Sequence, residues 1–431
     1  MLQKIEDMYD YFAKREQRFG MNFGLERMDA LLEGLHIQHN QQKFIHLAGT
    51  NGKGSTLHYL KKILSSQGYR VGTFTSPHIE SIKERIMIND EYIEEEDFLR
   101  LFNTVVQYVE SMEQENVFPT QFEILTIIAL MYFQEKKPDY VLMETGLGGR
   151  LDSTNVIHSL ISIITNISLD HTNILGNKIS GIAAEKAGII KEDSIVITGV
   201  KDEEALPVIK AKASEMNSEI LVINENFYVE SKMPTQNGEV FHYCFGNHTF
   251  EDCMISMLGK HQIDNASLAI TAALVLRDKY NVTLTNEAIR TGLLAANWKG
   301  RLETISETPK IIVDGSHNEA GISALIDTLK ARYRDKKIII VTAALADKDV
   351  DSMISMLEEV ADHMICTQFE MDRALEAEKL ATHCKNVPCS IEMSWEKALE
   401  KSLEMVDDDS LIVVTGSLYF LYYARPYLMK Y

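Results

Sequence analysis

The sequence has few cysteines and tryptophans and no long apolar run. Its five cysteines are scattered, and the closest pair, Cys384 and Cys389, has no second pair that would complete a metal cage. So few and scattered cysteines predict that the protein works in a reducing compartment. No apolar stretch approaches the roughly 20 residues of a membrane helix. The charged first residues also lack the apolar core of a signal peptide. We therefore expect a cytoplasmic protein.

Positive charge is scarce as well. The chain carries 43 lysines and arginines against 63 aspartates and glutamates, which gives a formal net charge of −20. The electrostatic field of a protein with this net negative charge repels nucleic acid and anionic lipid, so neither is expected as a partner. If the substrates are themselves anions, local cationic side chains and metal ions must overcome this repulsion.

With 431 residues the chain is too long for one ordinary core, and two domains are expected. Apolar strands alternate with helices, which predicts an α/β fold of two doubly wound domains with parallel sheets. The strands of the first domain are expected at 44–48, 71–75, 140–143, 160–167 and 195–198. A small antiparallel patch is expected within 226–256. Beyond a short linker at 297–301, strands are expected at 311–313, 337–341, 363–366 and 411–414. We place the domains at 1–297 and 298–431, the second being the smaller and Rossmann-like.

The segment Gly-Thr-Asn-Gly-Lys-Gly-Ser at 49–55 lies between an expected strand and an expected helix. Glycines let several backbone N–H groups point at a phosphate, and the helix start adds its positive dipole end. Lys53 would meet the β- and γ-phosphates. The spacing is unusual, because Leu47 and Gly54 stand where the common motif has a glycine and a hydroxyl. Ser55 or Thr56 would then bind magnesium, unless the metal is held from elsewhere. The alternative is a structural turn with no ligand.

Other polar residues follow the expected strands, where ligands bind in parallel sheets. Ser76, Glu144 and His171 all stand just past a strand end. The carboxylate of Glu144 suits magnesium, whereas a lone histidine such as His171 is more often structural. Lys186 lies on a helix that would point back to the same edge. An ammonium cannot bind a metal, but a neutral amine can react with carbon dioxide to give a carbamate; the alternative is a solvated helix lysine.

A second polar turn follows the expected strand at 311–313. Asp314 and His317 could be presented there to a nucleotide, and Arg301 in the linker could reach phosphates. The alternative is a capped helix start, with Ser316 or Asn318 as the N-cap. Both interpretations can hold together.

Taken in order, these and further motifs resemble the folylpolyglutamate synthases of the Mur ligase superfamily over nearly the whole chain. The matching segments are Gly-Thr-Asn-Gly-Lys-Gly-Ser (49–55), Thr-Ser-Pro-His (75–78), Glu-Thr-Gly-Leu-Gly-Gly-Arg-Leu-Asp-Ser-Thr-Asn (144–155), Leu-Asp-His (169–171), Glu-Lys-Ala-Gly-Ile-Ile (185–190), Gly-Lys-His-Gln (259–262) with Asn265, Gly-Arg-Leu-Glu (300–303), Asp-Gly-Ser-His-Asn (314–318), Asp-Lys-Asp (347–349) and Gly-Ser-Leu-Tyr (416–419). One departure is Ser316, where family members carry alanine. Residues 19–23 only partly resemble the corresponding segment of bifunctional relatives.

The resemblance implies a P-loop ATPase domain, with ATP in the cleft between two domains, and it assigns residues to four roles. ATP would be bound by Asn51, Gly52, Lys53, Gly54, Ser55, Asn265, Arg301 and Asp314. One Mg²⁺ ion would be held by Ser76 and Glu144, and a second by His171 and a carbamylated Lys186. Folate would contact Thr120, Phe122, Arg150 and Asp152. The residues implied in catalysis are Lys53, Lys186, His317 and Asp314.

The implied activity is the ATP-dependent addition of L-glutamate to the γ-carboxylate of a folate through an acyl phosphate, by a monomer. One alternative is a bifunctional enzyme that also adds glutamate to dihydropteroate. The other is a nucleotide-binding regulatory protein without ligase chemistry. The presence of Lys53, Glu144, His171 and Lys186 together argues against the regulatory protein.

Overall fold

The computed structural model describes residues 3–19, 23–38 and 41–430. Residues 20–22, within the segment that partly resembles bifunctional relatives, lie outside the described residues. The chain divides into two compact units. The first comprises Met1–Val229, Tyr243–Phe250 and Asn265–Ala295, and the second comprises Glu230–His242, Glu251–Asp264 and Ala296–Tyr431. The sequence-based domain boundary at 297/298 stays a prediction.

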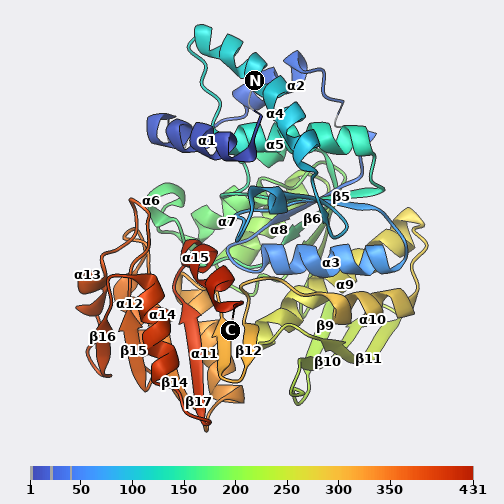
Figure 1. Cartoon of the computed structure of the whole chain (residues 1–431). Coiled ribbons are helices and arrows are strands. Elements are labelled where there is room, and N and C mark those ends of the chain that lie inside the picture. The colour runs from blue at the N-terminus through green and yellow to red at the C-terminus, as the bar shows by residue number, and fades with distance from the viewer. Residues whose placement is uncertain (1–2, 20–22, 39–40, 431) are drawn as a thin grey trace. The chain divides into compact units, whose positions relative to one another are not determined.

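The first unit is built on an eight-stranded sheet with helices on both faces (Figure 1). The strand order is β4-β3-β2-β5-β1-β6-β7-β8. The strands are β1 (Phe44–Ala48), β2 (Val71–Phe74), β3 (Ile86–Ile88), β4 (Glu91–Tyr92), β5 (Tyr140–Glu144), β6 (Ser159–Ile164), β7 (Ile195–Thr198) and β8 (Glu219–Val222). The helices are α1 (Ile5–Phe19), α2 (Glu26–Gly34), α3 (Lys53–Ser66), α4 (Glu95–Gln114), α5 (Gln121–Lys136), α6 (Thr172–Leu175), α7 (Ile179–Ala187), α8 (Ala205–Glu215), most of α9 (Lys260–Tyr280) and α10 (Asn286–Ala295).

Strand β1 lies inside this sheet and runs parallel to both neighbours, β5 and β6. All five of its residues are buried, as expected for a strand covered on both faces. In the register, Leu47 pairs with Glu144 of β5, and Ala48 pairs with Ile164 of β6. The three strands therefore end at the same edge, and the segments that follow them start side by side.

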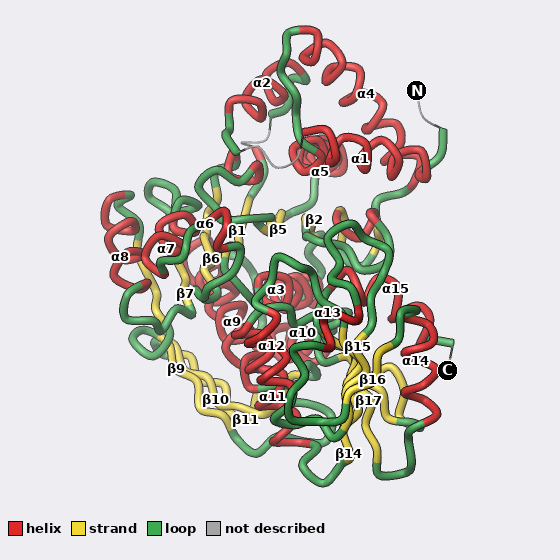
Figure 2. The backbone as a smooth tube through the Cα atoms, turned by 90° about the vertical axis from the view of Figure 1, so that its left-hand side faces the viewer, coloured by secondary structure: helices red, strands yellow, loops and turns green. Residues whose placement is uncertain are grey.

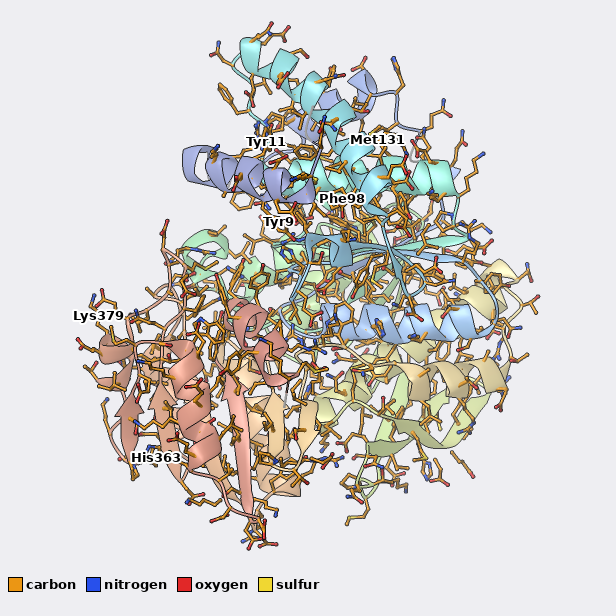
Figure 3. All side chains as sticks on the ribbon, viewed as in Figure 1. Tyr9, Tyr11, Phe98, Met131, His363 and Lys379 are labelled. Atoms are coloured by element: carbon orange, nitrogen blue, oxygen red, sulfur yellow. The ribbon has the colours of Figure 1, made fainter. Side chains whose placement is uncertain are left out.

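Helix α5 explains how one face of the sheet is covered. Thr120 and Glu123 form a reciprocal capping box at its start. The helix is apolar nearly all round, which predicts burial, and its side chains pack both on the sheet and against α1, α2 and α4. Figure 3 shows Tyr9, Tyr11 and Phe98 in this layer of side chains. Helix α3 covers the opposite face, and α10 packs on α3 (Figure 1).

The second unit has a six-stranded sheet of order β12-β13-β17-β14-β15-β16. Only β12 is antiparallel to its neighbour. Helices α11 to α13 cover one face and α14 and α15 the other (Figure 2). The elements are β12 (Glu303–Glu307), β13 (Lys310–Val313), α11 (Glu319–Arg332), β14 (Lys337–Thr342), α12 (Val350–Leu357), β15 (His363–Cys366), α13 (Ala377–Ala381), β16 (Cys389–Ile391), α14 (Trp395–Glu404), β17 (Ser410–Thr415) and α15 (Leu418–Leu428).

The doubly wound fold class is confirmed for both sheets, and the expected patch within 226–256 is a three-stranded sheet of order β11-β10-β9. Its strands are β9 (Phe227–Ser231), β10 (Glu239–Phe245) and β11 (His248–Ile255). The strand expected at 160–167 is wrong at its end, because β6 stops at Ile164. Among the described residues, no helix has both the length and the hydropathy needed to cross a bilayer.

Close packing of α10 on α3 generates a stability prediction. A Cβ added at Gly292 would lie 2.4 Å from the Cα of Ile63, so Gly292→Ala forces the helices apart. Overpacking of this kind costs about 1–3 kcal/mol, and we expect a lower midpoint of urea unfolding.

The control is Gly181→Ala on α7. A Cβ there meets only the Cβ of Lys178, at 4.0 Å. Alanine is the better helix former by about 1 kcal/mol, so this variant should unfold at an equal or higher urea concentration. Equal midpoints for Gly292→Ala and the wild type would show that the two helices do not touch as described.

Candidate functional site

The glycine-rich segment after β1 is held in place by the segment that follows β6. The amide of Thr50 donates to the carbonyl of Asn166 (3.0 Å), and the amide of Asn51 donates to Asn166 Oδ1 (3.0 Å). In return, Asn166 Nδ2 and Thr165 Oγ1 donate to the carbonyl of Asn51, at 2.9 and 2.6 Å. Polar groups of Thr165 and Asn166, the two residues that follow the end of β6 at Ile164, are thus used by this loop.

Two glycines in the loop adopt backbone angles that disfavour a side chain. Gly49 has φ +148°, and a Cβ there would lie 1.9 Å from Thr165 Oγ1. Gly52 has φ +84° and precedes α3, and a Cβ there would lie 2.3 Å from Asn265 Oδ1. The structure therefore brings Asn265 beside the loop. Because α3 begins at Lys53, the helix N-terminus starts where a phosphate loop requires it.

Two lysines converge on one carbonyl. Lys53 Nζ donates to the oxygen of Gly49 at 2.9 Å and to that of Thr50 at 3.3 Å, and Lys186 Nζ donates to the oxygen of Gly49 at 2.9 Å. The side chain of Lys186 is buried. Burial, and then repulsion by Lys53, lower the pKa of Lys186 to about 7, although Asp170 acts in the opposite direction. A substantial fraction of this amine is therefore neutral near pH 7.

Three of the predicted metal ligands, Ser76, Glu144 and His171, lie at or beyond the ends of β2, β5 and β6, and the fourth, Lys186, lies on α7. Glu144 ends β5 and is buried, and its Oε2 accepts from the amide of Ser76 at 3.3 Å. His171 precedes α6, and its Nε2 lies 4.0 Å from the carboxylate of Asp170. The Asp170 carboxylate also acts electrostatically on Lys186 and raises the pKa of its amine.

This donor set can be tested against magnesium, which prefers oxygen ligands. The carboxylate of Glu144 and the hydroxyl of Ser76 fit that preference. The amine of Lys186 does not fit, because it has no lone pair when protonated and is a poor partner for a hard cation when neutral. Carbamylation would give it two oxygens and a negative charge, and the set would then fit.

The four predicted folate contacts come from two segments that touch. Phe122, in the first turn of α5, lies against Gly146 in the loop after β5, and its ring centroid is 5.6 Å from that of Phe74. The hydroxyls of Thr126 and Ser153 join the same two segments at 3.0 Å. This arrangement brings Thr120 and Phe122 to the loop 146–154.

Arg150 and Asp152 have different surroundings on that loop. Arg150 is exposed and pairs with Glu185 at 2.7 Å. Asp152 is buried, which raises the pKa of its carboxyl group, and it accepts hydrogen bonds from Leu147 N (2.8 Å) and Thr154 N (3.0 Å). The Asp152 carboxylate therefore shapes the loop, which sequence reasoning did not anticipate.

The second unit gathers its own polar cluster after β13. Asp314 accepts from the amides of Ser316 (3.0 Å) and Leu302 (2.8 Å), and a Cβ at Gly315 would lie 3.3 Å from Nη1 of Arg301. His317 Nδ1 donates to the carbonyl of Gly315 at 2.8 Å, which requires the proton on Nδ1. Arg301, Asp314 and His317 are therefore neighbours.

The alternative of a capped helix holds at the same time. Asn318 is the N-cap of α11, and its side chain accepts from the amide of Gly321 at 2.9 Å. The residue missed here is His261, which is partly exposed. Desolvation lowers the pKa of its imidazole, Asp314 opposes that lowering and Arg301 adds to it. The Gly-Lys-His-Gln segment (259–262) is one of the motifs that match the family, but the sequence alone assigned no role to its histidine.

The strain at Gly52 generates a prediction for phosphate binding. Gly52→Ala places a Cβ into the side chain of Asn265 at a backbone angle that L-residues avoid. Strain of this kind costs about 1–3 kcal/mol, equivalent to a loss of roughly 5- to 150-fold in affinity for a non-hydrolysable ATP analogue measured by calorimetry.

Gly68→Ala is the matched control, because Gly68 has φ +97° but nothing within 4 Å of an added Cβ. It should lower stability while leaving affinity for the ATP analogue unchanged. Unchanged affinity in Gly52→Ala would mean that the loop does not bind the triphosphate.

Comparisons with known proteins agree with this geometry. The chain matches the family described as Mur ligase middle domain over residues 47–273, and the family described as Mur ligase, glutamate ligase domain over residues 300–418. It is 39% identical over 412 residues to the dihydrofolate synthase/folylpolyglutamate synthase of Bacillus subtilis, covering 94% of each chain. It is 36% identical over 409 residues to the folylpolyglutamate synthase of Lacticaseibacillus casei, again covering 94% of each.

A solved structure shares the architecture. The folylpolyglutamate synthase of Mycobacterium tuberculosis, complexed with ADP and AMPPCP, superposes with a TM-score of 0.91 at 29% identity, covering 98% of each chain. Both the sequence relatives and this structure span almost the full length of the chain. The chain therefore belongs to the Mur ligases and, among them, to the folylpolyglutamate synthases, a family of ATP-dependent ligases.

Proposed function

We propose that this protein adds L-glutamate to the γ-carboxylate of a reduced folate, converting ATP to ADP and phosphate. The observation that carries the proposal is the double contact of Lys53 and Lys186 with the Gly49 carbonyl, inside a phosphate loop that adjoins the buried Glu144. A structural turn has no need of two converging lysine amines. The family relatives supply the substrate class.

The reaction follows from the chemistry of amide formation. A carboxylate is a poor electrophile, so one oxygen of the γ-carboxylate attacks the γ-phosphorus of ATP, ADP leaves, and an acyl phosphate forms. The amine of the incoming glutamate then attacks the carbonyl carbon, and phosphate leaves with that oxygen. Such phosphoryl transfer depends mainly on positioning and on neutralising charge.

Residue roles are proposed on this basis. Lys53 and the α3 N-terminus, with Asn51, Gly52, Gly54 and Ser55, bind the phosphates, and Asn265, Arg301 and Asp314 also contact ATP. Mg²⁺ would neutralise phosphate charge there; Ser76 and Glu144 would hold one ion, and His171 and carbamylated Lys186 would hold a second. His317, with its proton on Nδ1, orients the second half-reaction through its other ring nitrogen. The proposed folate contacts are Thr120, Phe122, Arg150 and Asp152.

Purified protein tests the activity directly. Incubation with ATP, L-glutamate and tetrahydrofolate should release ADP only when glutamate and folate are both present. Dihydropteroate in place of tetrahydrofolate tests the bifunctional alternative, which the relatives leave open because they carry both kinds of name. ATP binding without glutamate-dependent ADP release would contradict the proposal and favour a regulatory protein. We further propose a cytoplasmic location, since none of the five cysteines forms a disulfide bond, and a monomeric state.

Removal of Lys53 should abolish most turnover. Lys53→Ala deletes a main electrostatic group at the transferring phosphoryl, which predicts a loss of more than about 100-fold in kcat. Lys62→Ala is the control, because Lys62 lies on the same helix but pairs with Asp90 at 2.6 Å. A wild-type kcat in Lys53→Ala would refute the proposed role of Lys53 in neutralising charge on the transferring phosphoryl group.

The lowered pKa of Lys186 predicts a pH-dependent carbamate. The neutral nitrogen attacks CO₂ and one proton is released, so falling pH through about 7 protonates the amine and removes the carbamate. With ¹³C-bicarbonate, a carbamate NMR signal should be present above that pH, should fade below it, and should be absent in Lys186→Ala. Short carboxylates should restore part of the activity of Lys186→Ala.

The matched control is Lys191→Ala. Lys191 also has its pKa lowered by burial, to about 8, but it donates to the carbonyl of Asn155. This variant should keep the carbamate signal and should gain nothing from added carboxylates. If Lys186→Ala kept full activity at low magnesium concentration, the proposed role of carbamylated Lys186 as a magnesium ligand would be contradicted.

A further inference from the structure

Three cysteine side chains meet in the second unit, away from the residues discussed so far. They are Cys366 at the end of β15, Cys384 shortly after α13, and Cys389 at the start of β16. The sulfur of Cys366 lies 3.6 Å from that of Cys384 and 3.6 Å from that of Cys389. All three sulfur atoms lie within 4.8 Å of one another.

The sheet register explains the meeting. Met364 of β15 pairs with Cys389 of β16, and side chains alternate along a strand, so Met364, Cys366 and Cys389 face the same side. Helix α13 contacts both strands, and the chain leaving it delivers Cys384. In Figure 3 the labels of His363 and Lys379 mark β15 and α13.

A buried carboxylate fixes the loop that joins Cys384 to Cys389. Glu358 Oε1 accepts from the amides of Lys385 (2.6 Å) and Asn386 (2.7 Å), and its Oε2 accepts from Asn386 Nδ2 (2.9 Å). The loop therefore does not depend on the cysteines for its shape. The three sulfur atoms are held near one another in advance, which lowers the cost of binding a ligand between them.

The sulfur spacing distinguishes a metal site from a disulfide. A disulfide brings two sulfur atoms to about 2.05 Å. When an ion is bound at about 2.3 Å from each of three sulfur atoms, the sulfur atoms lie about 3.8–4.0 Å from one another. The observed sulfur–sulfur distances of 3.6 Å are close to this value, so an ion can bind without backbone movement. The Sδ of Met364, 4.0 Å from the Cys384 sulfur, adds a thioether. The imidazole of His363 points to the other face and bonds Ser390 at 2.9 Å.

We propose that Cys366, Cys384 and Cys389 form a binding site for one thiophilic metal ion, with Met364 as a fourth soft donor. Thiolate sulfur suits monovalent copper, zinc and iron–sulfur clusters, and the thioether of Met364 favours monovalent copper among them, because it is a soft donor without charge. Binding releases the thiol protons, up to three for three thiolates bound. The bound ion links the edge strand β16 to β15 and to the chain after α13.

The test uses reduced, full-length protein under anaerobic conditions, titrated with Cu⁺ and separately with Cd²⁺ as a spectroscopic probe. We expect one equivalent to bind, with a sulfur-to-metal charge-transfer band. Because Cys384 and Cys389 are only partly buried, Cys384→Ser and Cys389→Ser are preferred to Cys366→Ser. Each should weaken binding at least about 10-fold.

Cys244→Ser is the matched control, because Cys244 is another partly buried free thiol, outside the cluster. It should bind like the wild type. Glutamate-dependent ADP release by Cys389→Ser should equal that of the wild type, which separates loss of the site from misfolding. Three results would each overturn the proposal. The first is absence of the charge-transfer band, and the second is metal binding that survives both Cys384→Ser and Cys389→Ser. The third is alkylation of all three cysteines at an undiminished rate when Cd²⁺ is present.

Discussion

The carbonyl oxygen of Gly49 is the point on which the first unit's site depends. It receives hydrogen bonds from Lys53 and Lys186, one from the helix that follows the loop and one from a helix more than a hundred residues later. Burial penalises the positive charge of Lys186, and repulsion by Lys53 at the same acceptor adds to that penalty. The energetically cheaper state leaves one amine neutral, and it is the buried one, Lys186. The same contact thus ties Lys186 to the loop, where burial and Lys53 together favour its neutral amine.

The sheet makes this contact possible. Strands β5, β1 and β6 are parallel and end together, so the segments after them meet without long connections. The backbone and side-chain groups of Thr165 and Asn166 close the loop from one side, and Glu144 ends the strand on the other. The second unit repeats the principle, because Asp314 follows a parallel strand and organises the turn that carries His317.

Much of this was readable from the sequence, for physical reasons. The alternation of apolar strands and helices predicted both sheets, and the glycines and lysine predicted the loop between β1 and α3. Other features depend on tertiary contacts that no local pattern records. The desolvation of Lys186 comes from packing, and the end of β6 was predicted three residues too late because Thr165 to Ile167 look like strand residues. Cys366 joins Cys384 and Cys389 only through strand register, which spacing along the chain does not reveal.

In the proposed reaction, ATP primes an unreactive carboxylate before the amine arrives. Isotope transfer tests it most directly. With both oxygens of the folate γ-carboxylate labelled with ¹⁸O, the phosphate released during glutamate addition should carry one labelled oxygen, because that oxygen attacks the γ-phosphorus and leaves with it. Unlabelled phosphate, released at the same rate as the glutamylated product, would contradict the account.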